Sequence, residues 1–324
     1  MSTINLKRMK KLLLILSCIL LNISFCLAQQ DAQYSMYRFN GLYINPAYAG
    51  SHDVLNVMAI YRHQWVKVPG NPQSASVAMH APLKNDKIGL GLIYNYDQLG
   101  VTKTNSINAN FAYRIAVGKN KNIRICLGIS AGADNYRANL NSIAVVDAND
   151  PNFSGNNQNR WLPNVGFGFY AYSERFFVGL SVPRILANKL DAKTSVFETS
   201  TNVARQYHNI LITAGYVFNL GKKVKFMPSM LVKYVPLHAP VSFDFNMCFI
   251  FIDRIWLGAG YRLNDSYNFM LAVNVSKQIR IGYSYDLTVS PLNKYTSGSH
   301  EVMASFDFNF TSKRVVSPRH VKYF

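Results

Sequence analysis

The sequence predicts an all-β fold, a transmembrane outer-membrane β-barrel of about fourteen antiparallel strands with short periplasmic turns and long extracellular loops. Three observations predict it. Apolar and polar residues alternate along many short segments, tight turns alternate with mostly longer connections, and no long apolar run follows the N-terminal region. The alternating segments are 54–65, 73–83, 88–96, 107–117, 123–131, 165–171, 176–182, 210–220, 224–234, 241–251, 255–263, 269–275, 279–287 and 302–310. An even number of strands is typical of single-chain outer-membrane barrels.

The connections give a second signal that is independent of hydrophobicity. Every connection after an even-numbered segment is a tight turn, as in 173–175 and 276–278. The connections after odd-numbered segments are mostly longer, above all 135–160, 184–205 and 288–300. Transmembrane barrels sort their connections in this way, with turns in the periplasm and loops outside the cell.

The composition fits the same fold class. Charged residues make up 15% of the 324 residues, below the roughly 25% of ordinary soluble domains. Aromatic residues reach 13%, and we expect the tyrosines near the segment ends to form girdles at the membrane surfaces. The formal net charge is +18, but the basic residues are scattered rather than gathered on one element, which argues against nucleic acid as a partner.

The first residues indicate export. Basic residues at positions 7, 8, 10 and 11 precede an apolar run over 12–27, and Cys26-Leu27-Ala28 has small side chains at the positions that signal peptidase reads. We therefore expect residues 1–28 to be a signal peptide, removed near Ala28 after Sec export to the outer membrane of a Gram-negative cell. The barrel is expected over 52–310.

Charged residues within the segments fall mostly on the inward parity, as expected where lipid covers the outer face. The residues expected to face the lumen are Arg62, Arg114, Arg124, Lys233, Asp244, Arg262, Arg280, Asp286 and Asp307. They could form an internal ion-pair network that rigidifies the barrel, or a lumen that attracts anions or an acidic segment.

Two terminal segments do not follow the alternation. Residues 29–51 are rich in aromatic and amide side chains, so we expect them to lie in the periplasm or dock in the lumen. The basic tail 311–324 is expected in the periplasm, where Lys313, Arg314, Arg319 and Lys322 could dock on periplasmic proteins or anionic lipid.

The sequence contains no motif that carries catalysis. Gly128-Ile129-Ser130-Ala131-Gly132 has the GxSxG spacing, but it overlaps the alternating segment 123–131 and is not a strand-to-helix elbow. There is no HExxH, no phosphate-binding glycine loop and no zinc-type spacing of Cys and His. Cys126 and Cys248 lie in alternating segments and are expected to be free thiols. His80 would be the best candidate of an outer-membrane hydrolase, but the sequence favours a protein without enzymatic activity, cofactor or metal.

Several motifs resemble the PorP/SprF family of type IX secretion system membrane proteins. The N-terminal ones are Tyr37-Arg38-Phe39-Asn40, then Asn45-Pro46-Ala47-Tyr48-Ala49-Gly50-Ser51, then Tyr61-Arg62-His63-Gln64-Trp65. Later ones include Asp147-Ala148-Asn149-Asp150-Pro151, Gly282-Tyr283-Ser284-Tyr285-Asp286 and Ser297-Gly298-Ser299-His300-Glu301. The resemblance extends from Gln29 to Phe310, with Ala32 standing where the family more often has proline.

The resemblance implies an outer-membrane component of the type IX secretion system that works with other components in the periplasm and outer membrane. In SprF-like members it implies export and surface anchoring of large adhesins with a C-terminal sorting domain, in gliding motility or adhesion. PorP-like members belong to the secretion apparatus itself. No catalytic residue is implied. The alternative is a diffusion channel or small-solute transporter, because many residues at inward positions are polar or basic.

Overall fold

The fold is described from a computed structural model, which covers residues 32–83, 86–118, 122–139, 158–188, 190, 206–236 and 239–308. The expected signal peptide, its cleavage site, the basic tail and parts of the long loops lie outside the described residues.

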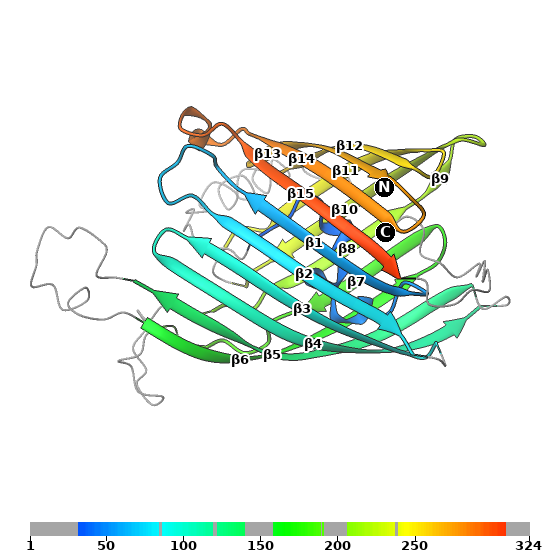
Figure 1. Ribbon diagram of the computed structural model, residues 1–324, viewed down its shortest axis with the longest axis horizontal. Helices are drawn as coiled ribbons and strands as arrows, with labels where there is room; N and C mark the ends of the chain where they lie inside the picture. The colour runs from blue at the N-terminus through cyan, green and yellow to red at the C-terminus, as the bar shows by residue number, and fades with distance from the viewer. Residues whose placement is uncertain are drawn as a thin grey trace, which may run out of the picture.

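The strands form one antiparallel sheet that closes on itself (Figure 1). In chain order they are β1 (Leu55–His63), β2 (Gln73–Pro82), β3 (Ile88–Leu99), β4 (Thr102–Val117), β5 (Ile123–Ala138), β6 (Gln158–Tyr172), β7 (Phe176–Val182), β8 (Ile210–Tyr216), β9 (Phe218–Asn219), β10 (Val224–Tyr234), β11 (Ser242–Phe251), β12 (Ile255–Arg262), β13 (Ser266–Asn274), β14 (Ile279–Thr288) and β15 (Ser299–Phe308). β8 and β9 are two parts of one strand interrupted at Val217, since both pair with β10. The barrel therefore has fourteen strands, as predicted, and it closes where β1 pairs with β15.

Side-chain burial alternates along the strands, which confirms the predicted fold class. In β13, for example, Tyr267, Phe269 and Leu271 are exposed on the outer face, whereas Asn268 and Met270 are buried inside. The outer face is thus apolar at mid-strand, and closure leaves no unpaired strand edge there. Among the described residues, no helix is long and apolar enough to cross a membrane.

Three neighbouring strands extend further than the alternation predicted. β4 and β5 have 16 residues each and β6 has 15, so pairing continues to Ala138 opposite Gln158. The loop predicted over 135–160 is correspondingly shorter. The prediction was wrong there because outward residues such as Lys103, Asn105 and Asn159 are polar, and the apolar half of the pattern disappears.

The two rims differ as expected. Tight turns close one rim, called the short-turn rim, and most of the longer connections lie at the opposite, long-loop rim (Figure 1). The long-loop rim also carries the 3₁₀ turn η4 (Pro291–Lys294) between β14 and β15.

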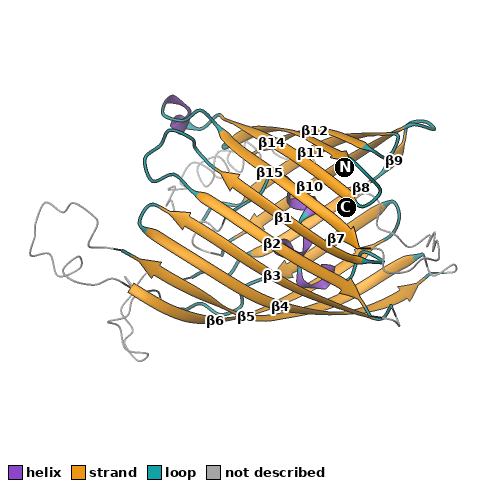
Figure 2. Ribbon diagram, in the orientation of Figure 1, coloured by secondary structure: helices purple, strands orange, loops and turns teal. Residues whose placement is uncertain are grey.

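The chain before β1 lies inside the barrel. Residues 33–52, called the inner segment, contain η1 (Tyr37–Phe39), α2 (Gly41–Ile44) and η2 (Pro46–Tyr48). Figure 2 shows these helical turns surrounded by strands. Residues 34–40, 42 and 44–52 are buried, and most of their apolar side chains form a core with inward residues such as Met227, Ile250 and Trp256. Tyr37 and Ile44 form a second, smaller cluster with Leu211 and Leu231.

Candidate functional site

The inner segment runs along the lumen from the long-loop half to the short-turn rim. Near its start, Gln33 donates to Asp244 at the long-loop end of β11 over 3.4 Å. Near its end, His52 Nδ1 lies 3.5 Å from Asp307 Oδ1 at the short-turn end of β15. The segment then continues directly into β1. It therefore occupies the lumen over most of the barrel's length.

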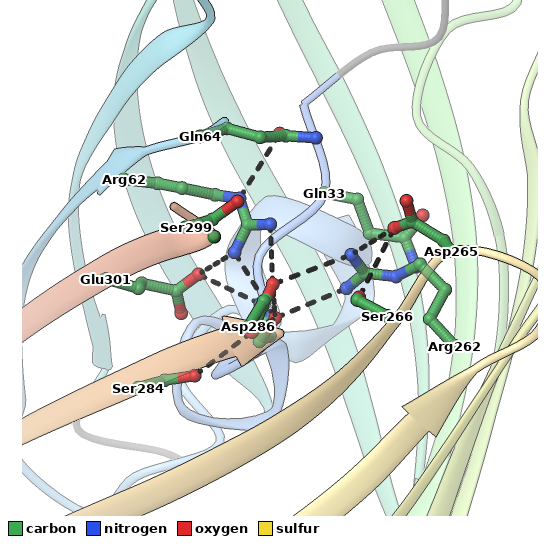
Figure 3. Close-up of polar contacts among 12 residues, drawn as sticks. Gln33, Arg62, Gln64, Arg262, Asp265, Ser266, Ser284, Asp286, Ser299 and Glu301 are labelled. Atoms are coloured by element: carbon green, nitrogen blue, oxygen red, sulfur yellow. Dashed lines mark hydrogen bonds and ion pairs between the residues drawn. The ribbon is translucent and has the colours of Figure 1, made fainter. Parts of the chain in front are cut away.

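A buried cluster of charged side chains anchors the start of the inner segment. Arg62 contacts Asp286 at 2.6 Å and Glu301 at 3.0 Å, while Arg262 contacts Asp244 at 2.9 Å and Asp286 at 3.8 Å. These five residues come from β1, β11, β12, β14 and β15, and Asp286 lies between the two guanidinium groups (Figure 3). We call them the ion-pair cluster.

The inner segment completes the hydrogen bonding of this cluster. The backbone N–H groups of Ser35 and Met36 donate to the two carboxylate oxygens of Glu301 over 2.9 and 2.7 Å. The Ser35 hydroxyl donates to Asp286 and accepts from Arg62 and Arg262 over 3.3 Å each. Buried charges are tolerable only when paired and hydrogen-bonded, so barrel wall and inner segment stabilise each other here.

Aromatic and cation–π contacts hold the middle of the inner segment. Phe39 meets Trp256 edge to face at 6.3 Å between ring centroids. The Arg280 guanidinium lies 4.5 Å from the centre of the Trp256 ring and 5.2 Å from that of Phe39. The adjacent Arg38 side chain reaches the sulfur of Met270 on β13.

Glycines of the barrel wall pack against residues 45–50, the part of the inner segment near the short-turn rim. A Cβ atom at Gly89 would lie 2.0 Å from the Ala49 carbonyl oxygen, and one at Gly128 would lie 2.2 Å from the Ala47 nitrogen. Asn45 both accepts from Ala47 N–H and donates to the Phe169 carbonyl oxygen over 2.8 Å. Residues 45–50, called the seal, therefore fit closely against the barrel wall near the short-turn rim.

Replacing Gly89 by alanine is expected to destabilise this seal. The new methyl group would overlap the Ala49 carbonyl, and overpacking of this kind costs about 1–3 kcal/mol. Thermal unfolding of the purified barrel measures the loss, and faster trypsin cleavage at Arg38 reports displacement of the inner segment. Gly221→Ala is the matched control, because a Cβ there has no neighbour within 4 Å. Equal stability of both variants would contradict the tight fit.

His80 faces the lumen as part of an aromatic group. Its ring lies 5.3 Å from that of Tyr48 and 5.0 Å from that of His52, and its Nδ1 accepts from Gly50 N–H over 3.2 Å. The Tyr48 hydroxyl lies 3.2 Å from Nε2 of His52. These contacts tie His80 to the inner segment, with no nucleophile arranged beside it among the described residues.

The other residues that the sequence predicted as sites differ in how deeply they are buried. Six of the nine charged residues expected in the lumen are buried: Arg62, Arg114, Lys233, Asp244, Arg262 and Asp286. Arg124, Arg280 and Asp307 are partly buried. All of the N-terminal motif residues are buried, namely Tyr37, Phe39, Asn40, Asn45, Pro46, Tyr48 and Gly50. Lys313, Arg314, Arg319 and Lys322 lie outside the described residues.

Sequence reasoning missed three contributors to the site. Glu301 was overlooked because the predicted last strand began at residue 302, although Glu301 shares the inward parity of Met303. Trp256 lies at an inward position of an alternating segment, but it has no charge that would mark it as different from other inward residues. Ser35 lies in a segment without alternation, and its role depends on where the inner segment docks.

Beside the inner segment, the long-loop half of the lumen contains a cavity of about 240 Å³. We call it the outer cavity. β3 to β6 supply a wall of amide and hydroxyl side chains, and Leu211, Leu231 and Val235 lie among its other lining residues. Among the described residues, no group of three or more His, Cys, Asp and Glu side chains is placed to hold a metal ion.

A closed fourteen-stranded barrel with an apolar outer face defines a β-barrel protein of the outer membrane. The profile of the family described as "Type IX secretion system membrane protein PorP/SprF" matches residues 26–306. The chain belongs to this family, and it is an outer-membrane component of the type IX secretion system.

The chain is similar to several solved structures at low sequence identity. The CymD monoaromatic hydrocarbon channel is 9% identical with a TM-score of 0.50, covering 83% of this chain and 93% of its own. Omp33 of Acinetobacter baumannii is 12% identical with a TM-score of 0.44, covering 80% of this chain and 100% of its own. A FadL homologue of Pseudomonas aeruginosa is 12% identical with a TM-score of 0.45, covering 82% and 93%. No curated protein sequence matches the chain.

Proposed function

We propose that this chain is a non-enzymatic subunit that supports export and surface anchoring of a large adhesin with a C-terminal sorting domain. The observation that carries the proposal is the inner segment. Its residues from Tyr34 to His52 are almost all buried against the barrel wall, so the lumen serves as a scaffold and the outer rim as the surface that a partner can reach.

The long-loop rim is the side suited to an exported partner. β4, β5 and β6 extend there beyond the apolar part of the barrel. The loops predicted over 135–160 and 184–205, parts of which lie outside the described residues, connect β5 to β6 and β7 to β8 on this side. In the proposed arrangement, the adhesin docks on this rim, other secretion components contact the periplasmic rim, and the tyrosine-rich outer face contacts outer-membrane lipid. Signal peptide cleavage near Ala28 leaves the inner segment at the start of the mature chain.

Deletion of the gene tests the proposal. We expect specific adhesins to be lost from the cell surface, as measured by surface labelling and by spreading on agar, while other exported cargo remains. Complementation with the intact gene should restore display. Normal display of every adhesin in the deletion strain would contradict the proposal.

The basic tail is proposed to dock on periplasmic components through Lys313, Arg314, Arg319 and Lys322. Truncation after Thr311 is expected to reduce recovery of periplasmic secretion proteins in pull-downs from detergent extracts, while the heat-modifiable migration of the barrel stays unchanged. A control truncation that removes only Tyr323 and Phe324 should keep these proteins. Unchanged recovery after the longer truncation would exclude a docking role.

The second candidate function is a diffusion channel or small-solute transporter. It is favoured by the polar outer cavity, and the structure of similar fold titled as a monoaromatic hydrocarbon channel belongs to that class. The buried inner segment counts against it, because the lumen is occupied by the protein's own backbone beside that cavity. Conductance measurements distinguish the two.

A further inference from the structure

The outer cavity has one polar wall and one apolar side. Five successive inward positions of β4 supply polar side chains, from Thr102 through Thr104, Ser106 and Asn108 to Asn110. Across the cavity, Leu211 on β8 and Leu231 on β10 are apolar, and Tyr34 and Tyr43 of the inner segment add aromatic rings. A ligand that fits must therefore combine a polar edge with an apolar face.

Four acceptor oxygens of the polar wall have no hydrogen-bond partner among the described residues. They are Oδ1 of Asn95, Asn108, Asp134 and Asn164, which belong to four successive strands and line the cavity. Asp134 is 1% exposed and Asn164 is 6% exposed. Burying an acceptor without a hydrogen-bond partner costs about 1–3 kcal/mol of free energy, so a ligand that donates to these oxygens would remove this penalty. The wall is thus arranged for a ligand with several donors in a small volume.

The charges around the cavity point to a neutral ligand. The acidic residues among the lining are Asp97 and Asp134, and the basic ones are Arg184 and Lys233. Asp134 is paired with Arg184 at 3.2 Å and also accepts from Gln206 over 2.8 Å, while Asp97 accepts from Ser74. Formal charges therefore balance, and neither a phosphate nor an ammonium group would gain a compensating net charge.

The size of the cavity distinguishes a saccharide from a peptide. A volume of about 240 Å³ holds one or two compact rings, if a water molecule occupies about 30 Å³. A sugar ring carries several hydroxyl donors around its edge, whereas an extended peptide offers one backbone N–H per residue. A sugar ring also has an apolar C–H face that can lie against tyrosine rings.

We propose that the outer cavity binds a neutral saccharide unit, with its hydroxyl groups donating to the amide and carboxylate oxygens of the polar wall. The apolar face of the sugar lies toward the tyrosines of the inner segment. This binding site is separate from the proposed adhesin docking, since it requires only the barrel and its own inner segment.

Saturation-transfer NMR on the full-length mature protein tests the proposal, in a detergent whose headgroup is not a sugar. The probes are cellobiose, maltose, lactose and N-acetylglucosamine disaccharide, with sialyllactose as the anionic comparison and tetraglycine as the peptide comparison. We expect saturation transfer to at least one neutral disaccharide. Asn108→Leu and Asn164→Leu should each raise the dissociation constant at least tenfold.

Asn105→Leu is the matched control, because Asn105 lies on the outward face of the same strand and accepts from Tyr94 there. It should leave the dissociation constant unchanged. Thr104→Val, which keeps the side-chain volume, is a milder second variant, and heat-modifiable migration checks the folding of each variant. Absence of saturation transfer to all neutral disaccharides, binding of sialyllactose or tetraglycine alone, or equal binding by all variants would each overturn the proposal. Adhesin display in cells is measured separately, so failure of one proposal does not decide the other.

Discussion

Replacing Arg62 by methionine is expected to lower the free energy of unfolding by about 3–5 kcal/mol, the usual cost of leaving a buried charge without its partner. The Arg62 and Glu301 side chains are 2% and 0% exposed, so water cannot take the place of the lost guanidinium. Of its two cationic partners Asp286 would keep Arg262, at 3.8 Å, together with the hydroxyl hydrogen bonds of Ser35 and Ser284. The destabilisation should reach the start of the inner segment, because Ser35 and Met36 bind to the same cluster.

Urea unfolding of the barrel in detergent micelles measures this loss. Arg254→Met is the matched control, since Arg254 is exposed in a tight turn and its removal should change stability by less than about 0.5 kcal/mol. Adding Glu301→Gln to Arg62→Met should cost less than the sum of the two single changes, because the second removes the charge left unpaired by the first. Equal losses for Arg62→Met and Arg254→Met would contradict the role of the ion-pair cluster.

Deleting residues 33–50 from the mature chain is expected to convert a closed barrel into an open pore. The deletion removes backbone that fills the lumen, and the inward amide, hydroxyl and charged side chains would then be hydrated. Single-channel recording in planar bilayers should show no steady conductance for the intact protein and a steady, reproducible conductance for the deletion variant. The Gly221→Ala variant serves as the control and should remain closed.

The outcome of this recording also decides between the two candidate functions. Steady conductance of the intact protein, equal to that of the deletion variant, would favour the diffusion channel and contradict the inner segment as a seal. Strains that carry the deletion variant should additionally become sensitive to large antibiotics. We expect intact strains to stay resistant, because residues 45–50 pack closely against the wall of the lumen.

The sequence predicted the barrel because its signal is local. Alternation in stretches such as 255–263 and 279–287 reports the inward and outward faces residue by residue, and tight turns mark one rim. The alternation did not predict the long-loop ends of β4, β5 and β6, because polar residues face both sides of the sheet there. Nor did the sequence predict the outer cavity, because its wall of amide and hydroxyl side chains forms only when β3, β4, β5 and β6 curve around the inner segment.

The inner segment shows a similar limit. Its aromatic and amide content indicated docking as one possibility, but the glycines that receive it are small residues at ordinary alternating positions. Gly89 and Gly128 have to be glycine because the backbone of Ala49 and Ala47 packs against them, and these alanines lie far away in the chain. Likewise, the pairing of Arg62 with Glu301 joins the first strand to the last, and no local pattern specifies it.

The contacts of Ser35 and Met36 have a consequence for the order of assembly in the cell. Their partners Asp286 and Glu301 lie 251 to 266 positions later in the chain. A chain that has inserted its early strands therefore still has unsecured residues at its beginning, and they become fixed only when β14 and β15 join β1. Completion of the barrel and anchoring of Ser35 and Met36 are thus one event. A chain interrupted before residue 286 would lack both carboxylates and leave Ser35 and Met36 unanchored.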